Sequence, residues 1–379
     1  MSVADDSAEE RSDSGALPHS LRVESRAIYA ALAAGVVGAV AGLILGFAVR
    51  PLPLSGEWAF GSLVAIAAGA IAGASSAVGY WRVRRMPGQE WRQRLSAATF
   101  TVNTVAVGLV HVVLAALGAL LMFFVLGLGF IGLVVDPFWA TVLMAVSLGL
   151  SAYLAYLSVS RMTTQRMSSL LMSFVAIGTV TAMVTAPDPR WWETHFSHLG
   201  TFWSISGLMF NGTLVVGGLL VTAFAVYLAN DMRVLSRRRT LSREQAPRVI
   251  STMFIIMGVM LAGVGMVPVN VSLLIHNLCA SGMAIMFIGM LAAGPWILRG
   301  MPRAYFLASW VFLAAVLLST ALFLRGFFGL TAFEIVVFAL IFGWISVFIR
   351  FLGVAGQREA INVNVESGPR RRATRVRTD

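Results

Sequence analysis

Residues 28–49, IYAALAAGVVGAVAGLILGFAV, contain no charged side chain and decide the fold class of this chain. At 1.5 Å per residue, a helix of this length spans the roughly 30 Å hydrocarbon core of a bilayer. Hydrophobic residues make up 58% of the whole chain and charged residues 12%, against about 45–50% and about 25% in soluble domains. So few polar residues cannot cover a soluble surface, and the chain must lie largely in lipid.

Further apolar runs of spanning length follow the first. The ten runs lie at approximately 28–49, 58–80, 98–124, 139–160, 167–186, 204–229, 249–267, 270–294, 304–324 and 331–349. They are long and unbroken, unlike the short alternating strands of membrane barrels, and a helix satisfies its own backbone polar groups. The sequence therefore predicts an all-α, polytopic integral membrane bundle of about ten transmembrane helices.

Arginine supplies all 28 basic residues, because the chain has no lysine. Arginines cluster after the second, fourth, sixth and eighth runs and in the C-terminal tail, whereas the other connections hold at most one each: Arg50, Arg190 and Arg325. By the positive-inside rule, both termini are predicted to be cytoplasmic and the loop containing residues 187–203 to face outward. The expected location is the plasma (inner) membrane.

The net charge of +11 follows from these arginine clusters. Arginines at cytoplasmic helix ends attract anionic lipid headgroups, so we expect membrane lipids as partners and no nucleic acid.

The single cysteine, Cys279, excludes an intramolecular disulfide and a cysteine-cluster metal site. No cofactor is expected. Basicity from arginine alone, with many Ala, Gly and Val residues, indicates a bacterial, actinobacterial origin.

The outward loop carries an unusual polar cluster, WWETHFSHLGTFW at residues 191–203. Its tryptophans suit the membrane interface, where an apolar ring with a polar N–H lies at headgroup level. His195 and His198 are spaced i, i+3 and share a face if the segment is helical. Ser197 is placed to cap the sixth span. Interface anchoring and ligand contact are both open interpretations of the two histidines.

Polar residues also lie inside the spans, at Asn211 in the sixth and at His276 and Asn277 in the eighth. Asn211 and His276 each fall about 10 Å below the outer surface, counting from the span ends, so they are placed to face one another. Such groups are expensive in a bilayer, which makes them functional candidates or interhelical hydrogen bonds. The candidate outward-facing site comprises His195, Ser197, His198, Asn211, His276 and Asn277.

A metal site would need several of these ligands to converge. The candidate ligands are His195, His198 and His276, with Glu193 or Asp188. The HxxH spacing lacks the general base of H-E-x-x-H sites, so no metal is predicted. A Ser197 nucleophile lacks the G-x-S-x-G elbow.

Acidic residues near the outer connections are few. Glu334 is expected to be solvated or to pair with Arg325. Between Glu57 and Glu334 no carboxylate lies at the centre of a predicted helix, which disfavours proton-coupled transport.

Two segments, FSHLGTFWSISGLMFNGTLVVGGLL and GVGMVPVNVSLLIHNLCASGMAIMF, resemble the bacterial multi-spanning family called domain of unknown function 998. The matching elements are S-x-L-G at Ser197, Leu199 and Gly200, the F-N pair at Phe210 and Asn211, and a proline turn before a histidine at Pro268 and His276. The chain departs from the family's aromatic and acidic positions at Met266, Val267 and Asn270. The resemblance covers about residues 165–350 and implies a distant similarity to eukaryotic membrane proteins of lipid-anchor remodelling and autophagy modulation.

The predicted organisation is a disordered cytoplasmic tail (1–26), a four-helix transmembrane segment (27–160), a six-helix module (165–350) and a basic disordered tail (351–379). The leading hypothesis is a non-enzymatic membrane protein that binds or handles lipid or envelope precursors at the outer leaflet. The alternatives are an outer-leaflet metal-assisted hydrolase or transferase, which requires His195, His198 and His276 to converge, and a secondary transporter.

Overall fold

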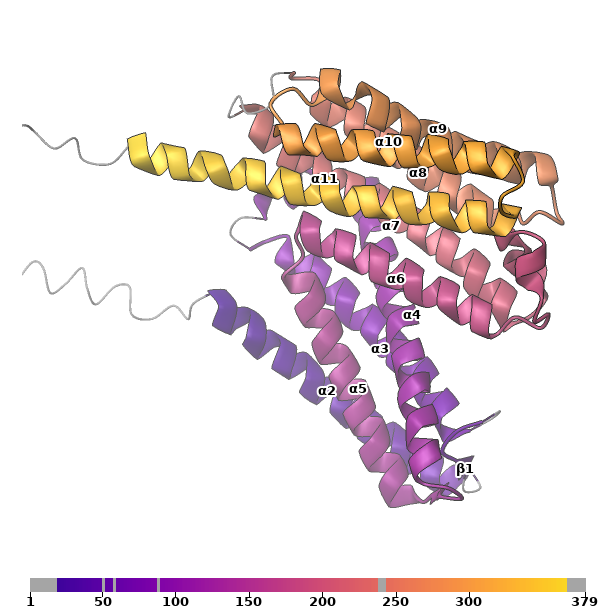
Figure 1. The fold of residues 1–379 in the computed structure, drawn as a ribbon. Coiled ribbons are helices and arrows are strands. Elements are labelled where there is room, and N and C mark those ends of the chain that lie inside the picture. The colour runs from indigo at the N-terminus through magenta and orange to yellow at the C-terminus, as the bar shows by residue number, and fades with distance from the viewer. Residues whose placement is uncertain (1–18, 50–51, 57–58, 87–88, 238–242, 367–379) are drawn as a thin grey trace, which may run out of the picture. The chain divides into compact units, whose positions relative to one another are not determined.

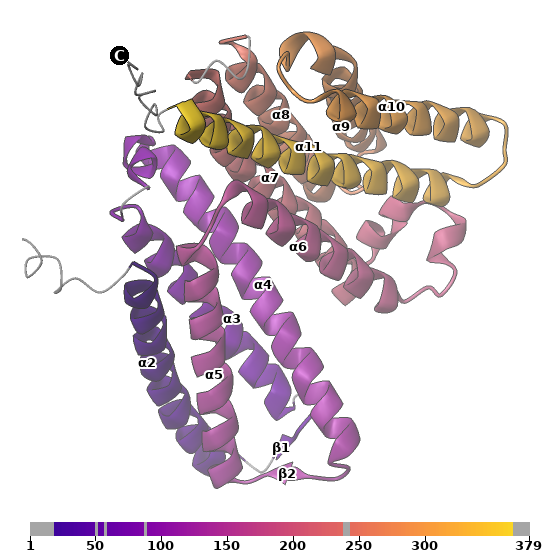
Figure 2. The same ribbon diagram turned by 60° about the vertical axis from the view of Figure 1, so that its left-hand side comes forward.

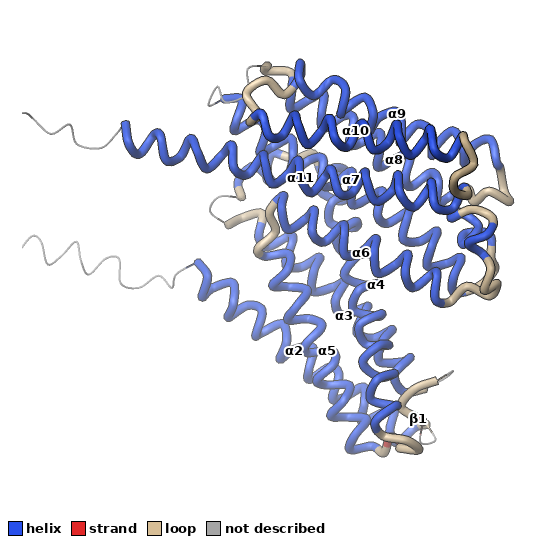
Figure 3. The backbone as a smooth tube through the Cα atoms, in the orientation of Figure 1, coloured by secondary structure: helices blue, strands red, loops and turns tan. Residues whose placement is uncertain are grey.

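The computed structural model describes residues 19–49, 52–56, 59–86, 89–237 and 243–366. Within these residues, ten helices are long and apolar enough to cross a membrane, and Figure 3 shows that helices dominate the backbone. The prediction of an all-α polytopic bundle is thereby confirmed. The chain divides into two compact units, Met1–Met162 and Thr163–Asp379, called unit 1 and unit 2 below.

Unit 1 contains four long helices and one short ribbon within its described residues (Figure 2). In chain order these are α2 (His19–Ala48), β1 (Leu52–Pro53), α3 (Phe60–Val83), η1 (Glu90–Arg94), α4 (Ala97–Gly129), β2 (Val134–Val135) and α5 (Pro137–Ser160). The ribbon is antiparallel and pairs Leu52 with Val135. Asp136 caps α5, because its carboxylate accepts from the backbone N–H of Trp139 at 2.8 Å.

Glycines in α2 allow that helix to approach α5 closely. A Cβ atom on Gly38 would lie 2.7 Å from the carbonyl oxygen of Met144, and one on Gly42 would overlap the carbonyl of Ala140. Small residues at a spacing of four let membrane helices pack backbone against backbone, where van der Waals contact replaces the hydrophobic effect. The small-residue pattern of the first apolar run is thus used for packing.

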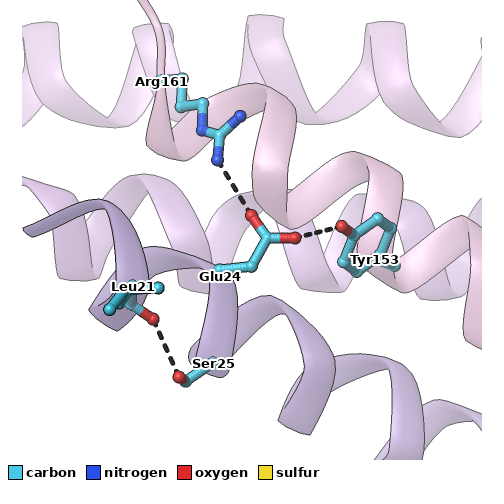
Figure 4. A network of polar contacts seen from close by, with 5 residues as sticks. All are labelled: Leu21, Glu24, Ser25, Tyr153 and Arg161. Carbon is cyan, nitrogen blue, oxygen red and sulfur yellow. Dashed lines mark hydrogen bonds and ion pairs between the residues drawn. The ribbon is translucent and has the colours of Figure 1, made fainter.

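Glu24 of α2 joins the same two helices by polar contacts (Figure 4). The Tyr153 hydroxyl donates to one carboxylate oxygen, and Arg161 donates to the other at 2.9 Å. Ser25 uses its hydroxyl locally, donating to the carbonyl of Leu21. Because Glu24 and Arg161 are 34% and 42% exposed, the ion pair contributes only about 0–1 kcal/mol.

Unit 2 contains the remaining helices, which run alongside one another in Figure 1. They are α6 (Thr164–Val184), the short turns η2 (Trp191–Glu193) and η3 (Phe196–Thr201), then α7 (Ile205–Arg237), α8 (Ala246–Met266), α9 (Leu273–Ile297), α10 (Arg303–Leu324) and α11 (Leu330–Glu366). The most apolar window of α7 is 67% buried, against 11% for that of α10. Helix α7 is therefore the central helix of unit 2 and α10 is peripheral.

The helices extend past several predicted bounds. Helix α2 begins at His19, α7 continues to Arg237, and α11 continues to Glu366, although the sequence favoured a tail or connection at each of these places. Residues 1–18 and 367–379 of the two expected tails lie outside the described residues. Hydropathy marks where a span leaves the apolar region, whereas backbone hydrogen bonding can continue into polar sequence.

Candidate functional site

A pocket of about 290 Å³ lies inside unit 2, between η3 and helices α7 to α11. Most of its lining is apolar. The polar side chains that line it are Ser197, His276, Ser281, Thr320 and Glu334, and none of the described lining residues is an arginine. Its volume is close to the lower limit of about 300 Å³ for small-molecule pockets.

The polar and apolar parts of this pocket lie at different depths. Ser197 belongs to η3, and Glu334 lies in the first turn or two of α11. Ile341 of α11 also lines the pocket and lies about 16 Å along the axis from the start of that helix. Ile288 lies about 22 Å from the start of α9 by the same measure. The pocket is therefore polar near the connection and apolar towards the middle of the bundle.

The pocket also reaches the surface of the unit. Ser281 lines it and is at the same time exposed on α9. The pocket lining therefore extends to the lateral surface of α9.

Glu334 holds the η3 turn against α11. Its carboxylate accepts from the backbone N–H of Phe196 at 2.5 Å and also from that of Ser197. The Phe196 ring packs edge-on against Phe210 at 5.1 Å and lies 6.1 Å from Phe338 of α11. Polar and aromatic contacts thus fix the turn over one end of the pocket.

This position of Glu334 differs from the sequence interpretation. The carboxylate was expected to be solvated or to pair with Arg325. In the structure it accepts hydrogen bonds from backbone N–H groups of η3 instead. Phe196 and Ser197 are the first two residues of η3, and the first N–H groups of a helical turn have no acceptor within it, so they need an outside acceptor. A single acid at the start of an otherwise apolar span was the only signal in the sequence.

His276 is buried, with 5% of its surface exposed, and its Nδ1 lies 2.9 Å from the carbonyl oxygen of Val267. A carbonyl can only accept, so Nδ1 carries the proton, and in the neutral ring Nε2 is left as an acceptor. Ser272 begins the helix by accepting from the backbone N–H of Ile275 at 3.4 Å, which places His276 in the first turn of α9. His276 is thus held with one orientation at the polar end of the pocket.

His195, Ser197 and His198 form a compact group at the start of η3. His195 Nδ1 lies 3.0 Å from the Ser197 hydroxyl oxygen, and the two imidazole rings are 5.5 Å apart. Burial lowers the pKa of His195 below its ordinary value, and the nearby His198 and His276 lower it further. His195 is therefore neutral at pH 7 and able to accept or donate one hydrogen bond.

The predicted capping role of Ser197 is wrong. Helix α7 begins at Ile205, and Ser197 lies in the preceding η3 turn, where its hydroxyl contacts His195. The intervening residues form their own short turn, so the serine is too far along the chain to reach the orphan N–H groups of α7.

Asn211 and His276 do not form the pair that their matched depth suggested. Asn211 donates through Nδ2 to the carbonyl of Gly200 at 2.7 Å, and His276 bonds to Val267 instead. Each side chain therefore ties a connection to a helix. A Cβ on Gly200 would overlap the Asn211 amide, so this contact requires glycine.

Of the six predicted site residues, only Ser197 and His276 line the pocket. His195 and Asn211 lie outside its lining, and so do the remaining two. Asn277 is exposed on α9, and His198 contacts Thr201 and Phe202 within the connection. Among the described residues, no three His, Cys, Asp or Glu side chains form a group that could hold a metal ion. The convergence that a metal-assisted hydrolase needs is thus missing from the part of the chain that the structure describes.

Two larger hollows lie where α7 ends. One, of about 390 Å³, includes Thr164 and Asp231, whose side chains share a 2.5 Å hydrogen bond. The other, of about 480 Å³, includes Arg233, Arg248 and Glu244. Both lie at the end of the bundle opposite to η3, away from the histidine cluster.

Comparison with known proteins gives one match. Residues 170–350 match the family described as Protein of unknown function (DUF998), in agreement with the resemblance seen in the sequence. No curated protein and no solved structure matches the chain.

Proposed function

Since residues 170–350 match the model of the DUF998 family, we propose that unit 2 binds a single-chain lipid or a comparable envelope precursor and does not transform it. The single observation that carries this proposal is the pocket itself. It is polar beside the η3 turn, apolar towards mid-bundle, and open at Ser281. An amphiphile is likewise polar at one end and apolar along the rest of its length.

The distribution of arginine supports an outer-leaflet site. The η2 and η3 turns lie in the connection that the positive-inside rule assigns to the outer face. Trp192 and Trp203 of this connection are 57% and 101% exposed, as expected for rings that lie among lipid headgroups. A lipid of the outer leaflet would then enter beside α9 with its head near η3.

The opposite end of unit 2 suits a different lipid contact. Arg233 of α7 and Arg248 of α8 line the same hollow. Guanidinium groups bind phosphate through paired hydrogen bonds. We propose that anionic headgroups of the cytoplasmic leaflet of the plasma membrane occupy this hollow and anchor the bundle.

A pocket-filling variant tests the main proposal. Ala284 of α9 lines the pocket, whereas its neighbour Ile285 is 61% exposed and does not. Ala284→Phe is expected to lower lipid binding at least about tenfold, a change of roughly 1.4 kcal/mol, and Ile285→Phe to leave it unchanged. Native mass spectrometry of the detergent-purified protein, with added lauroylglycerol, measures the bound fraction. Equal occupancy in both variants would overturn the proposal.

A further inference from the structure

Three polar side chains at the η3 end of the pocket each have the capacity to accept a hydrogen bond. Glu334, His276 and Ser197 all line the pocket, and they come from α11, α9 and η3. Each already has a protein partner, and that partner determines what the group can still offer to a ligand.

Glu334 offers a carboxylate oxygen. A carboxylate has about four lone-pair sites, and the N–H groups of Phe196 and Ser197 account for two bonds to it. Acceptor capacity therefore remains on a side chain that lines the pocket.

His276 also offers an acceptor. Its Nδ1 proton is directed to the carbonyl of Val267 at 2.9 Å, which leaves Nε2 as the ring nitrogen available to a ligand. In an uncharged imidazole that nitrogen is an acceptor. Ser197 lies 3.0 Å from His195 Nδ1 through its hydroxyl oxygen, and that oxygen keeps at least one further lone pair. Three acceptors thus surround the polar end.

No cationic side chain balances them. None of the described lining residues is an arginine, and the chain has no lysine. A phosphate or carboxylate placed here would face a carboxylate across a poorly solvated space, where like charges repel strongly. A hydroxyl or an ammonium group would instead satisfy the acceptors.

Resting on the proposed lipid binding, we infer that the pocket selects amphiphiles whose head is a hydrogen-bond donor without negative charge, and rejects phosphate and carboxylate heads. The shared chemistry is donation to Glu334, His276 Nε2 and the Ser197 oxygen. A long-chain amine and an acylglycerol both supply it. The hollow at the opposite end has two arginines and one carboxylate, Glu244, among its lining residues, so its guanidinium groups favour anionic heads there.

Probes with the same tail and different heads test this selection. Dodecylamine, lauroylglycerol and dodecyl phosphate are titrated against the full-length protein in a neutral detergent, with native mass spectrometry as the readout. The amine and the glyceride are expected to bind the pocket at least about tenfold more tightly than the phosphate, equivalent to roughly 1.4 kcal/mol. The Ala284→Phe variant identifies the fraction bound in this pocket.

The outcomes separate the two proposals. If no probe is displaced by Ala284→Phe, the pocket binds no amphiphile and the proposed function fails. If the phosphate binds this pocket as tightly as the amine, lipid binding stands and the selection for donor heads is overturned.

Glu334→Gln sharpens the test, because glutamine keeps an oxygen that can accept from Phe196. Charge-assisted hydrogen bonds are about twice as strong as neutral ones, so dodecylamine is expected to lose about tenfold in affinity (roughly 1.4 kcal/mol). Lauroylglycerol should change by less than about threefold, or roughly 0.65 kcal/mol. Glu193→Gln is the charge-matched control, because Glu193 is exposed in η2 and lies outside the pocket lining. An unchanged ratio of amine to glyceride affinity in Glu334→Gln would contradict a role for the carboxylate.

Discussion

Single polar side chains fix the outer connection of unit 2 onto its helices. Asn211 holds Gly200, Glu334 holds Phe196, and His276 holds Val267, in each case through a backbone group. An unsatisfied backbone group near the hydrocarbon region costs several kcal/mol. Polar residues at the outer ends of these spans therefore stabilise the connection, and two of them, Glu334 and His276, also line the pocket.

Asn211→Ala tests this arrangement. The variant leaves the Gly200 carbonyl without its partner, so the free energy of unfolding should fall by about 1–2 kcal/mol. Asn277→Ala is the control, since Asn277 is exposed on α9 and its loss should change stability by less than about 0.5 kcal/mol. Thermal unfolding of the two variants in the same detergent measures the difference. Equal midpoints would mean that the 2.7 Å bond to Gly200 contributes nothing.

At the scale of the elements, glycine sets how closely the helices pack. A Cβ on Gly258 of α8 would lie 2.6 Å from the carbonyl oxygen of Gly218 in α7, and one on Gly218 would overlap the backbone of Gly258. The same device joins α2 to α5 in unit 1. Membrane helices gain stability from such close contacts, because lipid offers no hydrophobic drive for helices to associate.

Gly258→Ala is therefore expected to destabilise the α7–α8 contact. The added methyl group meets backbone that cannot move without separating the helices, which costs about 1–3 kcal/mol. Gly212→Ala in α7 is the matched control, because a Cβ there would meet nothing within 4 Å. Equilibrium unfolding in a denaturing detergent compares the two. A Gly212 variant as unstable as the Gly258 variant would show that helix propensity or detergent effects, not packing, dominate.

At the scale of the whole molecule, the distribution of arginine predicts the orientation in the membrane. The arginine clusters lie on alternate connections along the chain. With the ten candidate spans of the described residues, alternate connections lie on the same side of the membrane, so all the clusters share one side. Helix α6 links an arginine-rich connection to an arginine-poor one. Gln165 lies at the start of this helix, and Glu193 follows its C-terminal end. Both residues are exposed, so both can report the side on which they lie.

Cysteine labelling tests the orientation. Single cysteines at these positions, Gln165→Cys and Glu193→Cys, are introduced after Cys279→Ala removes the native thiol. An impermeant maleimide should label Glu193→Cys in intact cells and Gln165→Cys only after permeabilisation, because the arginine-rich side is retained in the cytoplasm. The reverse pattern would overturn the predicted orientation and with it the assignment of the pocket to the outer leaflet.

The sequence by itself determined that the chain is a bundle of about ten membrane helices, and that residues 170–350 resemble one family. Both are readable because the length of an apolar run and a short motif are local properties of the chain. Several polar residues at the outer ends of the spans were also recognisable, since they stand out against an apolar background.

Only the tertiary structure decided which of those polar residues meet. Glu334 contacts Phe196 across a separation of 138 residues, and the pocket takes side chains from η3 and five helices. Depth along a span can be counted from the sequence, but the direction in which a side chain points depends on how each helix is rotated against its neighbours. For that reason Asn211 and His276, though matched in depth, bind different backbone carbonyls, and the acid that completes the polar end of the pocket was found only in the fold.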